Sequence, residues 1–129
     1  MEIVYGTIIA VKLQDSLLLL RRAKKETDAG MWEFPTGTFE KSDQTIYDTA
    51  VRELREETGL EAKRLHYLGD MQRRDGERLY YGYAYLAEEV AGKLKLSEEH
   101  DDYRWVSRDE LADYMLDRNT ELLLRLYEV

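Results

Sequence analysis

The sequence has 129 residues, 43% of them hydrophobic and 36% charged, so it fits one compact domain over residues 1–129 and excludes a multidomain arrangement. It has no cysteine, which excludes a disulfide framework, a thiolate zinc site and a cysteine nucleophile. Its formal charge of −8 disfavours broad binding to a nucleic-acid backbone, so we expect no stable complex with nucleic acid.

The first part of the chain is predicted to form strands. Ile3 to Val11 is rich in β-branched residues and predicts one strand, and Leu17 to Leu20 predicts a second, buried strand after a turn at Gln14-Asp15. Met31 to Phe34 predicts a short extended segment that Pro35 ends.

The clearest helix is predicted from Thr45 to Thr58. Its apolar residues recur at spacings of three and four, so they form one stripe along the helix. These residues are Ile46, Tyr47, Ala50, Val51 and Leu54. Gly59 follows directly and supplies the expected stop.

Three further strands are predicted after this helix. They are Leu65 to Leu68, Arg78 to Ala87 and Tyr103 to Val106, with a turn at Asp75-Gly76 between the first two. With the segments before the helix, this makes five or six strands of mixed direction.

Two short helices are predicted near the end of the chain. The capping signature Ser107-x-x-Glu110 predicts a helix to about Leu116, and Asn119 is predicted to open a last helix over Glu121 to Tyr127. Strands therefore outnumber helices, and the pattern predicts an α+β fold with helices packed on the faces of a mixed sheet.

Three glutamates are predicted to project from one patch of the central helix. Glu53, Glu56 and Glu57 lie within about 100° of one another around the helix axis, and Arg52 offsets only part of their repulsion. A hard divalent cation such as Mg²⁺ would offset the rest, since it takes carboxylate oxygens and completes its shell with phosphate oxygens and water. The alternative is a solvated acidic face.

The run from Gly37 to Leu60 resembles the sequence signature of the Nudix family. The stretch from Arg52 to Leu60 matches the family pattern at fixed spacing. The preceding part departs from it, because the family's first glutamate falls on Gln44 and the loop holds one extra residue. Asp43 can substitute for that glutamate. Thr36 stands where relatives usually have glycine.

The resemblance implies a fold and a metal site. The fold would be an α/β/α sandwich, a mixed β-sheet with helices on both faces. Glu53, Glu56 and Glu57 would hold one or more Mg²⁺ ions, or Mn²⁺, at a diphosphate, while Arg52 would orient the carboxylates. The backbone carbonyl of Thr36 would also reach the metal.

A second acidic segment, Ser97-Glu98-Glu99-His100, precedes the last predicted strand. Nudix relatives often bring a catalytic glutamate from this region, which makes Glu99 a candidate for the general base alongside Glu53. The alternative for Glu99 is a solvated acidic turn. His100 is expected to be a hydrogen-bonding residue of this loop rather than a metal ligand.

Substrate recognition is suggested by resemblance to the bacterial 8-oxo-dGTP pyrophosphatases within the family. Leu17 to Arg22, followed by Glu33-Phe34-Pro35, is similar to them in residue type and spacing, which implies that Arg22 contacts the nucleotide. Asn119 by the same resemblance would read a purine edge, and its alternative is a helix N-cap. The segment from Ser97 to Val106 instead resembles the diadenosine-tetraphosphate hydrolases and other general members.

Two aromatic side chains are further candidates for contact with a base. Tyr81 alternates with Tyr83 and Tyr85 along a predicted strand, so the three face one side, where a ring can stack on a base. Trp32 precedes the signature loop and can wall a pocket. Packing within the protein is the alternative for both.

The sequence therefore predicts a Mg²⁺-dependent hydrolase that cleaves a nucleoside triphosphate, oxidised purine deoxynucleotides included, to a monophosphate and pyrophosphate. One alternative is a dinucleoside polyphosphate or nucleoside-diphosphate sugar as substrate. Another is a non-catalytic nucleotide-binding regulatory module, suggested by Gln44 and Thr36. We expect a small-molecule nucleotide as partner, a monomer or homodimer, no membrane association and a cytoplasmic location, because no stretch resembles a membrane span or a signal peptide.

Overall fold

Two hydrophobic strands at the start of the chain form the centre of the fold. The computed structural model describes residues 1–129, and its first strands are β1 (Glu2–Leu13) and β2 (Ser16–Arg22). The middle of each strand is buried, residues 6–11 of β1 and residues 17–20 of β2. Alternate residues of a strand point to opposite sides of a sheet, so these buried residues serve both faces. Ile8 and Ala10 thus enter one hydrophobic cluster, and Ile9 and Val11 enter the other.

The remaining strands extend the sheet on both sides of this pair. β1 pairs in parallel with β6 (Arg78–Ala91), which pairs antiparallel with β5 (Glu61–Asp75). β2 pairs antiparallel with β7 (His100–Ser107), and the short β3 (Trp32–Glu33) and β4 (Thr36–Thr38) pair with β2 and β1. The sheet is therefore mixed, with seven strands rather than the five or six expected.

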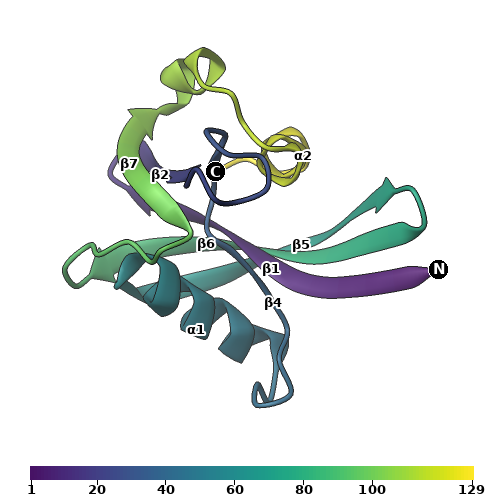
Figure 1. Cartoon of the computed structure of the whole chain (residues 1–129). Coiled ribbons are helices and arrows are strands. Elements are labelled where there is room, and N and C mark those ends of the chain that lie inside the picture. The colour runs from purple at the N-terminus through teal and green to yellow at the C-terminus, as the bar shows by residue number, and fades with distance from the viewer.

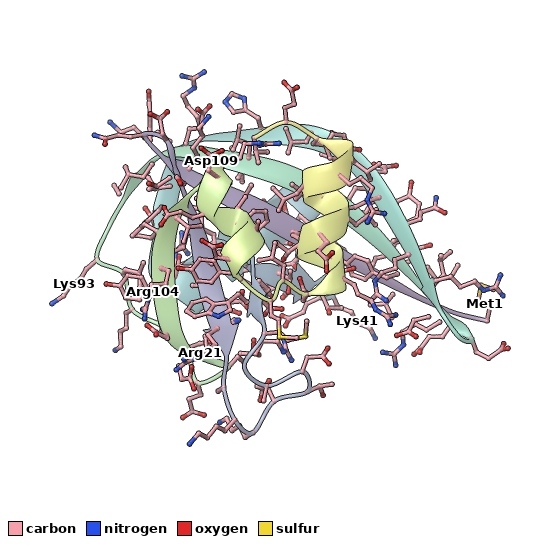
Figure 2. All side chains as sticks on the ribbon, turned by 90° about the horizontal axis from the view of Figure 1, so that it is seen from above. Met1, Arg21, Lys41, Lys93, Arg104 and Asp109 are labelled. Atoms are coloured by element: carbon pink, nitrogen blue, oxygen red, sulfur yellow. The ribbon has the colours of Figure 1, made fainter.

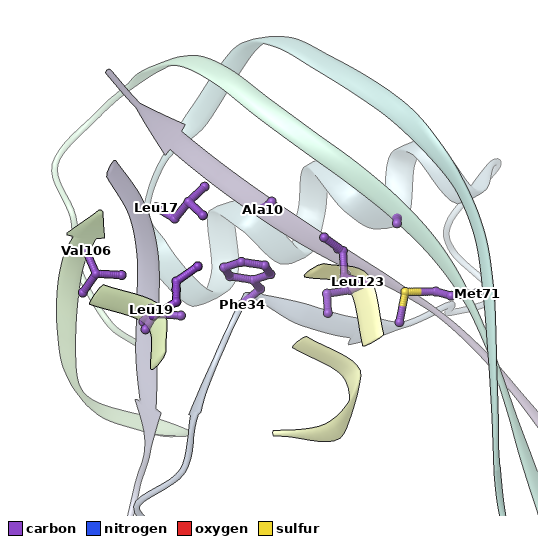
Figure 3. Close-up of a cluster of buried hydrophobic side chains, with 10 residues drawn as sticks. Ala10, Leu17, Leu19, Phe34, Met71, Val106 and Leu123 are labelled. Carbon is purple, nitrogen blue, oxygen red and sulfur yellow. The ribbon is translucent and has the colours of Figure 1, made fainter. Parts of the chain in front are cut away.

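The helices lie on opposite faces of the sheet (Figure 1). The helix α1 (Ile46–Thr58) covers one face, and α2 (Arg118–Leu126) covers the other. Figure 3 shows the cluster on the α2 side, where Leu19, Phe34, Met71 and Leu123 converge from four different segments. This arrangement confirms the predicted sandwich.

Local capping signals define α1. The Thr45 side chain accepts a hydrogen bond from the Asp48 N–H at 3.2 Å, and the Asp48 carboxylate accepts one from the Thr45 N–H at 3.2 Å. At the other end Gly59 is left-handed, with φ 75°, and its N–H donates to the Arg55 carbonyl at 2.8 Å. The predicted boundaries of this helix are confirmed.

The hairpin of β5 and β6 is much longer than predicted. Its pairing runs from Glu61 opposite Ala91 to Asp75 opposite Arg78, and the predicted turn at Asp75-Gly76 joins its strands. The end of this hairpin projects together with β1, and Met1, which precedes β1, lies at the edge of the molecule (Figure 2). Polar residues fill the projecting part of β5, so it lacks the apolar alternation that marks a strand.

Two predictions near the C-terminus are wrong in detail. The helix predicted from Ser107 to about Leu116 is a 3₁₀ helix over Arg108–Asp113. The last helix begins at Arg118 rather than Glu121, and its N-cap is Asp117, whose carboxylate accepts from the Thr120 N–H at 2.9 Å. Asn119 is therefore not the cap.

Neither α1 nor α2 has the length and apolar composition that a bilayer-spanning helix requires.

Candidate active site

A pocket lined entirely by polar residues lies between α1, β4 and the loop before β7. Its volume is about 310 Å³. We call it the carboxylate pocket, and its lining residues are Thr36, Gly37, Thr38, Glu40, Glu53, Glu57 and Glu99. The pocket thus brings together two glutamates of the helix and the glutamate that was predicted from the second acidic segment.

Glu57 is the most buried carboxylate of the pocket. It is 4% exposed, it forms no ion pair, and its Oε1 accepts a hydrogen bond from the Thr36 N–H at 3.0 Å. Burial, the adjoining Glu99 side chain and the negative charge of Glu33 raise the pKa of Glu57 well above its ordinary value. The pocket therefore concentrates negative charge without supplying a cation to this group.

Arg52 holds the second carboxylate and the loop before the helix. Its Nη1 donates to Glu53 at 2.7 Å and to Glu56 at 3.2 Å, and its Nη2 donates to the Thr38 carbonyl at 3.1 Å. Burial raises the pKa of Glu53, and the hydrogen bond and charge of Arg52 oppose this shift. Arg52 thus fixes Glu53 beside β4.

Asp43 is committed to Arg52. Its two oxygens accept from Arg52 Nε at 2.9 Å and Nη2 at 2.8 Å, and they also accept from the Thr49 hydroxyl and the Glu40 N–H. The bidentate contact with Arg52 is the largest reason that the pKa of Asp43 is lowered far below its usual range. The loop thus brings the carboxylate of Asp43 to this arginine, although the family's glutamate falls on position 44, where this chain has Gln44.

Glu56 differs from its two neighbours on the helix. Its side chain is 56% exposed, and it is absent from the residues that line the carboxylate pocket. The three glutamates therefore do not converge equally, because Glu53 and Glu57 face β4 while Glu56 faces solvent beside Arg52. The sequence placed them on one patch but could not distinguish these environments.

Gly37 permits the close approach of β4 and α1. A Cβ atom at this position would lie 1.8 Å from Cδ of Glu53, so any other residue would collide with the Glu53 side chain. The neighbouring Thr36 lines the pocket and donates its backbone N–H to Glu57. Threonine at this position is therefore compatible with a carboxylate held against the strand.

Glu33 and His100 form a buried pair behind the pocket that the sequence analysis did not identify. His100 Nε2 lies 2.8 Å from Glu33 Oε2, and Arg22 Nη1 donates to the same oxygen at 3.1 Å. The side chains of His100 and Glu33 are 0% and 3% exposed. The two residues are 67 positions apart, so no local pattern could have revealed their contact.

Arg22 and Trp32 are both engaged with the protein itself. Besides Glu33, Arg22 bonds the Thr27 carbonyl through Nε. Trp32 packs edge-on against Tyr114, with ring centroids 5.2 Å apart. The guanidinium groups of Arg21 and Arg104 lie 5.6 and 5.7 Å from its ring centroid. These two arginines belong to the neighbouring strands β2 and β7, and Figure 2 shows them on the same side of the molecule.

Asn119 lies near a second hollow on the α2 side of the sheet. Its Oδ1 accepts a hydrogen bond from Arg73 Nε at 2.8 Å. The hollow has a volume of about 500 Å³. It is lined by Thr27, Asp28, Met31, Arg73, Asp75, Asp117 and Arg118, and we call it the α2-side hollow. Burial, with a contribution from the charge of Glu33, raises the pKa of Asp117 to about 6.

Tyr81 lies on the opposite face of the sheet from Asn119. Arg73, which bonds Asn119, pairs with Tyr80 across the hairpin, so Tyr81 points to the other side. There its ring packs 5.3 Å from that of Tyr83, and its hydroxyl donates to Asp70. The expected shared face of the alternating tyrosines is confirmed, and Tyr81 lines neither the carboxylate pocket nor the α2-side hollow.

The residues of the carboxylate pocket fit a divalent cation. Glu57 is a buried carboxylate with no positive partner, and Glu53 and Glu99 supply further oxygen atoms around the same space. Nδ1 of the nearby His100 is buried and has no hydrogen-bond partner. Hard oxygen donors with net negative charge are the ligands that Mg²⁺ and Mn²⁺ favour.

Comparison with known proteins assigns the chain to a family. The model of the NUDIX domain matches residues 5–127. The chain therefore belongs to the Nudix family, and it is a Nudix hydrolase. The match confirms the resemblance carried by the run from Gly37 to Leu60.

Relatives with similar sequences are named for different substrates. The chain is 31% identical over 116 residues to the CTP pyrophosphohydrolase of Escherichia coli (strain K12), covering 90% of this chain and 84% of that protein. It is 30% identical over 116 residues to an 8-oxo-dGDP phosphatase of Danio rerio, covering 90% of this chain and 32% of that protein. A crystal structure of a MutT Nudix hydrolase from Burkholderia pseudomallei superposes with a TM-score of 0.83 at 21% identity, covering 99% of this chain and all (100%) of that one.

Proposed function

We propose that this Nudix hydrolase cleaves a nucleoside triphosphate to a nucleoside monophosphate and pyrophosphate, with Mg²⁺ as its ion. The observation that carries the proposal is the carboxylate pocket, in which the buried Glu57 lies with Glu53 and Glu99 and without a positive partner. Bound divalent ions would neutralise charge on phosphoryl oxygens and activate a water molecule for attack on phosphorus.

The protein's own side chains have distinct tasks in this scheme. Arg52 keeps Glu53 in place through its 2.7 Å contact, while Asp43 anchors the other edge of the guanidinium. Glu53 or Glu99 accepts the proton of the attacking water, because both line the pocket. Glu57 and Glu53 would hold the ions, and Glu56, which shares Arg52 Nη1 with Glu53, would be the outermost of the ion-binding glutamates.

The nucleoside would lie in the α2-side hollow. Glu33 lies near enough to both sites for its charge to contribute to the raised pKa of Asp117 and of Glu57. Arg73 holds the side-chain oxygen of Asn119, which leaves the amide nitrogen to donate to a base edge. The named relatives that act on CTP and on 8-oxo-dGDP make cytidine and oxidised guanine nucleotides the first candidates.

A second candidate substrate is a dinucleoside polyphosphate. An arginine-rich hollow of about 410 Å³ lies between β5 and α2 and shares Arg73 and Arg118 with the α2-side hollow. It is lined by Gln72, Arg73, Arg74, Arg118, Glu121, Leu122 and Arg125. Arginines of this kind bind phosphate groups, so the additional phosphates of a longer substrate would have a place to bind.

The decisive experiment measures pyrophosphate and monophosphate release from a nucleotide panel. The panel contains CTP, dCTP, dGTP, 8-oxo-dGTP, 8-oxo-dGDP, a diadenosine polyphosphate and ADP-ribose, each with Mg²⁺, Mn²⁺ or a chelator. We expect ion-dependent release of pyrophosphate from a triphosphate. Cleavage of the diadenosine substrate alone would favour the second candidate. Tight nucleotide binding without turnover over hours would replace both with a regulatory binding module.

A further inference from the structure

We propose that His100 supplies a nitrogen ligand to a divalent-metal site that it shares with Glu57 and Glu99, so that the site prefers transition ions such as Co²⁺ to Mg²⁺. The inference deepens the proposed function, because it concerns the ion that serves the same pocket. A ring nitrogen of His100 and a carboxylate oxygen from each of the two glutamates all lie within 4.8 Å of one another. That spacing allows a single ion to contact all three groups.

The environment of the imidazole leaves one nitrogen free for a ligand. An ionised carboxylate only accepts hydrogen bonds, so the 2.8 Å contact with Glu33 places the proton of the neutral ring on His100 Nε2. Nδ1 then carries a lone pair. It is buried, it has no hydrogen-bond partner, and the side chain as a whole is 0% exposed. A buried acceptor left unpaired costs free energy, and a bound cation would remove that cost.

Glu33 has the features of a residue that orients a metal-binding histidine. Histidines that bind metals usually donate their other N–H to a carboxylate, which fixes the ring and raises its basicity. Glu33 is itself fixed, because it is 3% exposed and accepts from Arg22 at 3.1 Å. Arg22 and Glu33 therefore hold His100 through Nε2 and leave Nδ1 without a partner.

A nitrogen ligand changes the choice of ion. Mg²⁺ strongly prefers oxygen ligands, whereas imidazole favours later first-row ions such as Co²⁺ and Zn²⁺. A site made of two carboxylates and one imidazole therefore binds Co²⁺ more tightly than Mg²⁺. A site made of carboxylates alone would show a smaller difference between these ions.

The direct test is the pulsed electron paramagnetic resonance spectrum of Mn²⁺ bound to the 129-residue protein. Coordination by imidazole produces a ¹⁴N modulation that carboxylate and water ligands do not produce. The chain has 2 histidines, and His66 is the matched control, because its side chain is 44% exposed and pairs with Glu88 on the β5–β6 hairpin. We expect the modulation in the wild type and in His66→Gln, and we expect its loss in His100→Gln.

Ion affinities give an independent measurement. By calorimetric titration, His100→Gln should weaken Co²⁺ binding by at least about tenfold and change Mg²⁺ binding much less, whereas His66→Gln should change neither. Glu33→Gln keeps a hydrogen-bond acceptor but loses its charge, so it should weaken Co²⁺ binding by about tenfold and retain the ¹⁴N signal. Circular dichroism confirms that each variant is folded. If His100→Gln does not fold, the His66→Gln protein still tests the histidine ligand. His100 is then the one histidine left, so a ¹⁴N modulation in this variant must come from it.

The outcomes separate this inference from the proposed function. Bound Mn²⁺ without ¹⁴N modulation in a protein that hydrolyses nucleotides would overturn the histidine ligand and leave the hydrolase intact. A ¹⁴N signal that depends on His100 in a protein without turnover would support the ligand and remove the proposed reaction. A ¹⁴N signal lost in His66→Gln and kept in His100→Gln would also overturn the inference.

Discussion

Among the individual residues, Glu57 lies in the carboxylate pocket in surroundings that destabilise its charged form. It is 4% exposed with no positive partner, and burial raises its pKa. Glu57→Gln removes the buried charge. With a chelator present we therefore expect the free energy of unfolding to increase by about 1 kcal/mol and Tm to rise by roughly 4 °C. We expect the same variant to lose turnover by orders of magnitude. Thermal denaturation and a product assay test both effects.

Glu56→Gln is the matched control on the same helix. Its side chain is 56% exposed, so we expect Tm to change by less than about 1 °C, because surface substitutions have small effects. We expect lower turnover here too, since Glu56 is one of the proposed ion-binding residues. A lower Tm in Glu57→Gln than in the wild type would contradict the account of a strained carboxylate.

Asp117 should make stability depend on pH. Its pKa rises from an ordinary value of 3.8 to about 6 on folding, because of burial and the nearby charge of Glu33. The folded protein therefore binds this proton more tightly than the unfolded chain. The contribution to stability is present below about pH 4 and is lost as pH rises through about 6, amounting to on the order of 3 kcal/mol.

The corresponding measurement uses Asp117→Asn. The amide oxygen can still cap α2 at the Thr120 N–H, so we expect higher stability than the wild type at pH 7.5 and a flatter profile of urea unfolding from pH 4 to 7.5. The exposed Asp113 provides the control, and Asp113→Asn should reproduce the wild-type profile. Parallel profiles for Asp117→Asn and the wild type would contradict this origin of the pH dependence.

At this scale the sequence predicted residue types better than their surroundings. The match from Arg52 to Leu60 located the helical glutamates, because motif and spacing are local. It could not show that Glu56 faces solvent or that Glu33 contacts His100. Those features depend on segments that are distant in the sequence and come together only in the folded protein. Asp43 was recognised as a substitute, and the structure adds its bidentate contact with Arg52.

Among the elements, β4 and α1 depend on each other at Gly37. A methyl group there would lie 1.8 Å from Cδ of Glu53 and would displace that carboxylate. Because a displacement of about 1 Å can cost roughly a hundredfold in rate, we expect Gly37→Ala to lower kcat by about that factor. Phe39→Ala, which alters an exposed residue directly after the same strand and outside the carboxylate pocket, should change kcat by less than about threefold. Equal rates for the two variants would contradict the contact.

Elements with local signals were predicted well, and elements without them were not. Thr45 and Gly59 marked the ends of α1 because capping depends on adjacent residues. The residues Glu61 to Asp75 carry many charges, so the full length of β5 follows only from its pairing with β6. The 3₁₀ helix begins with the same Ser107–Glu110 capping box that opens an α-helix, so the capping signal alone did not distinguish them.

For the whole molecule, ion binding should raise the stability of the fold. The proposed ion-binding groups come from α1 and from the segment before β7, so the unfolded chain does not hold them together. At a free ion concentration one hundred times Kd, we expect a gain of about 2.7 kcal/mol. Thermal denaturation with MgCl₂, MnCl₂ or CoCl₂ against chelator measures this gain, with NaCl at matched ionic strength as the control. An unchanged Tm would mean that the folded protein has no such site.

The pairing of β1 with β6 and of β2 with β7 also has a consequence for biosynthesis. These contacts join residues that leave the ribosome far apart in time, so one edge of the apolar run Leu17 to Leu20 stays unpaired until β7 has been made. A nascent chain released before residue 107 therefore leaves this strand edge incompletely paired, and exposed apolar strands promote aggregation. Translational pausing within the first hundred codons should accordingly increase the demand of this protein for chaperones.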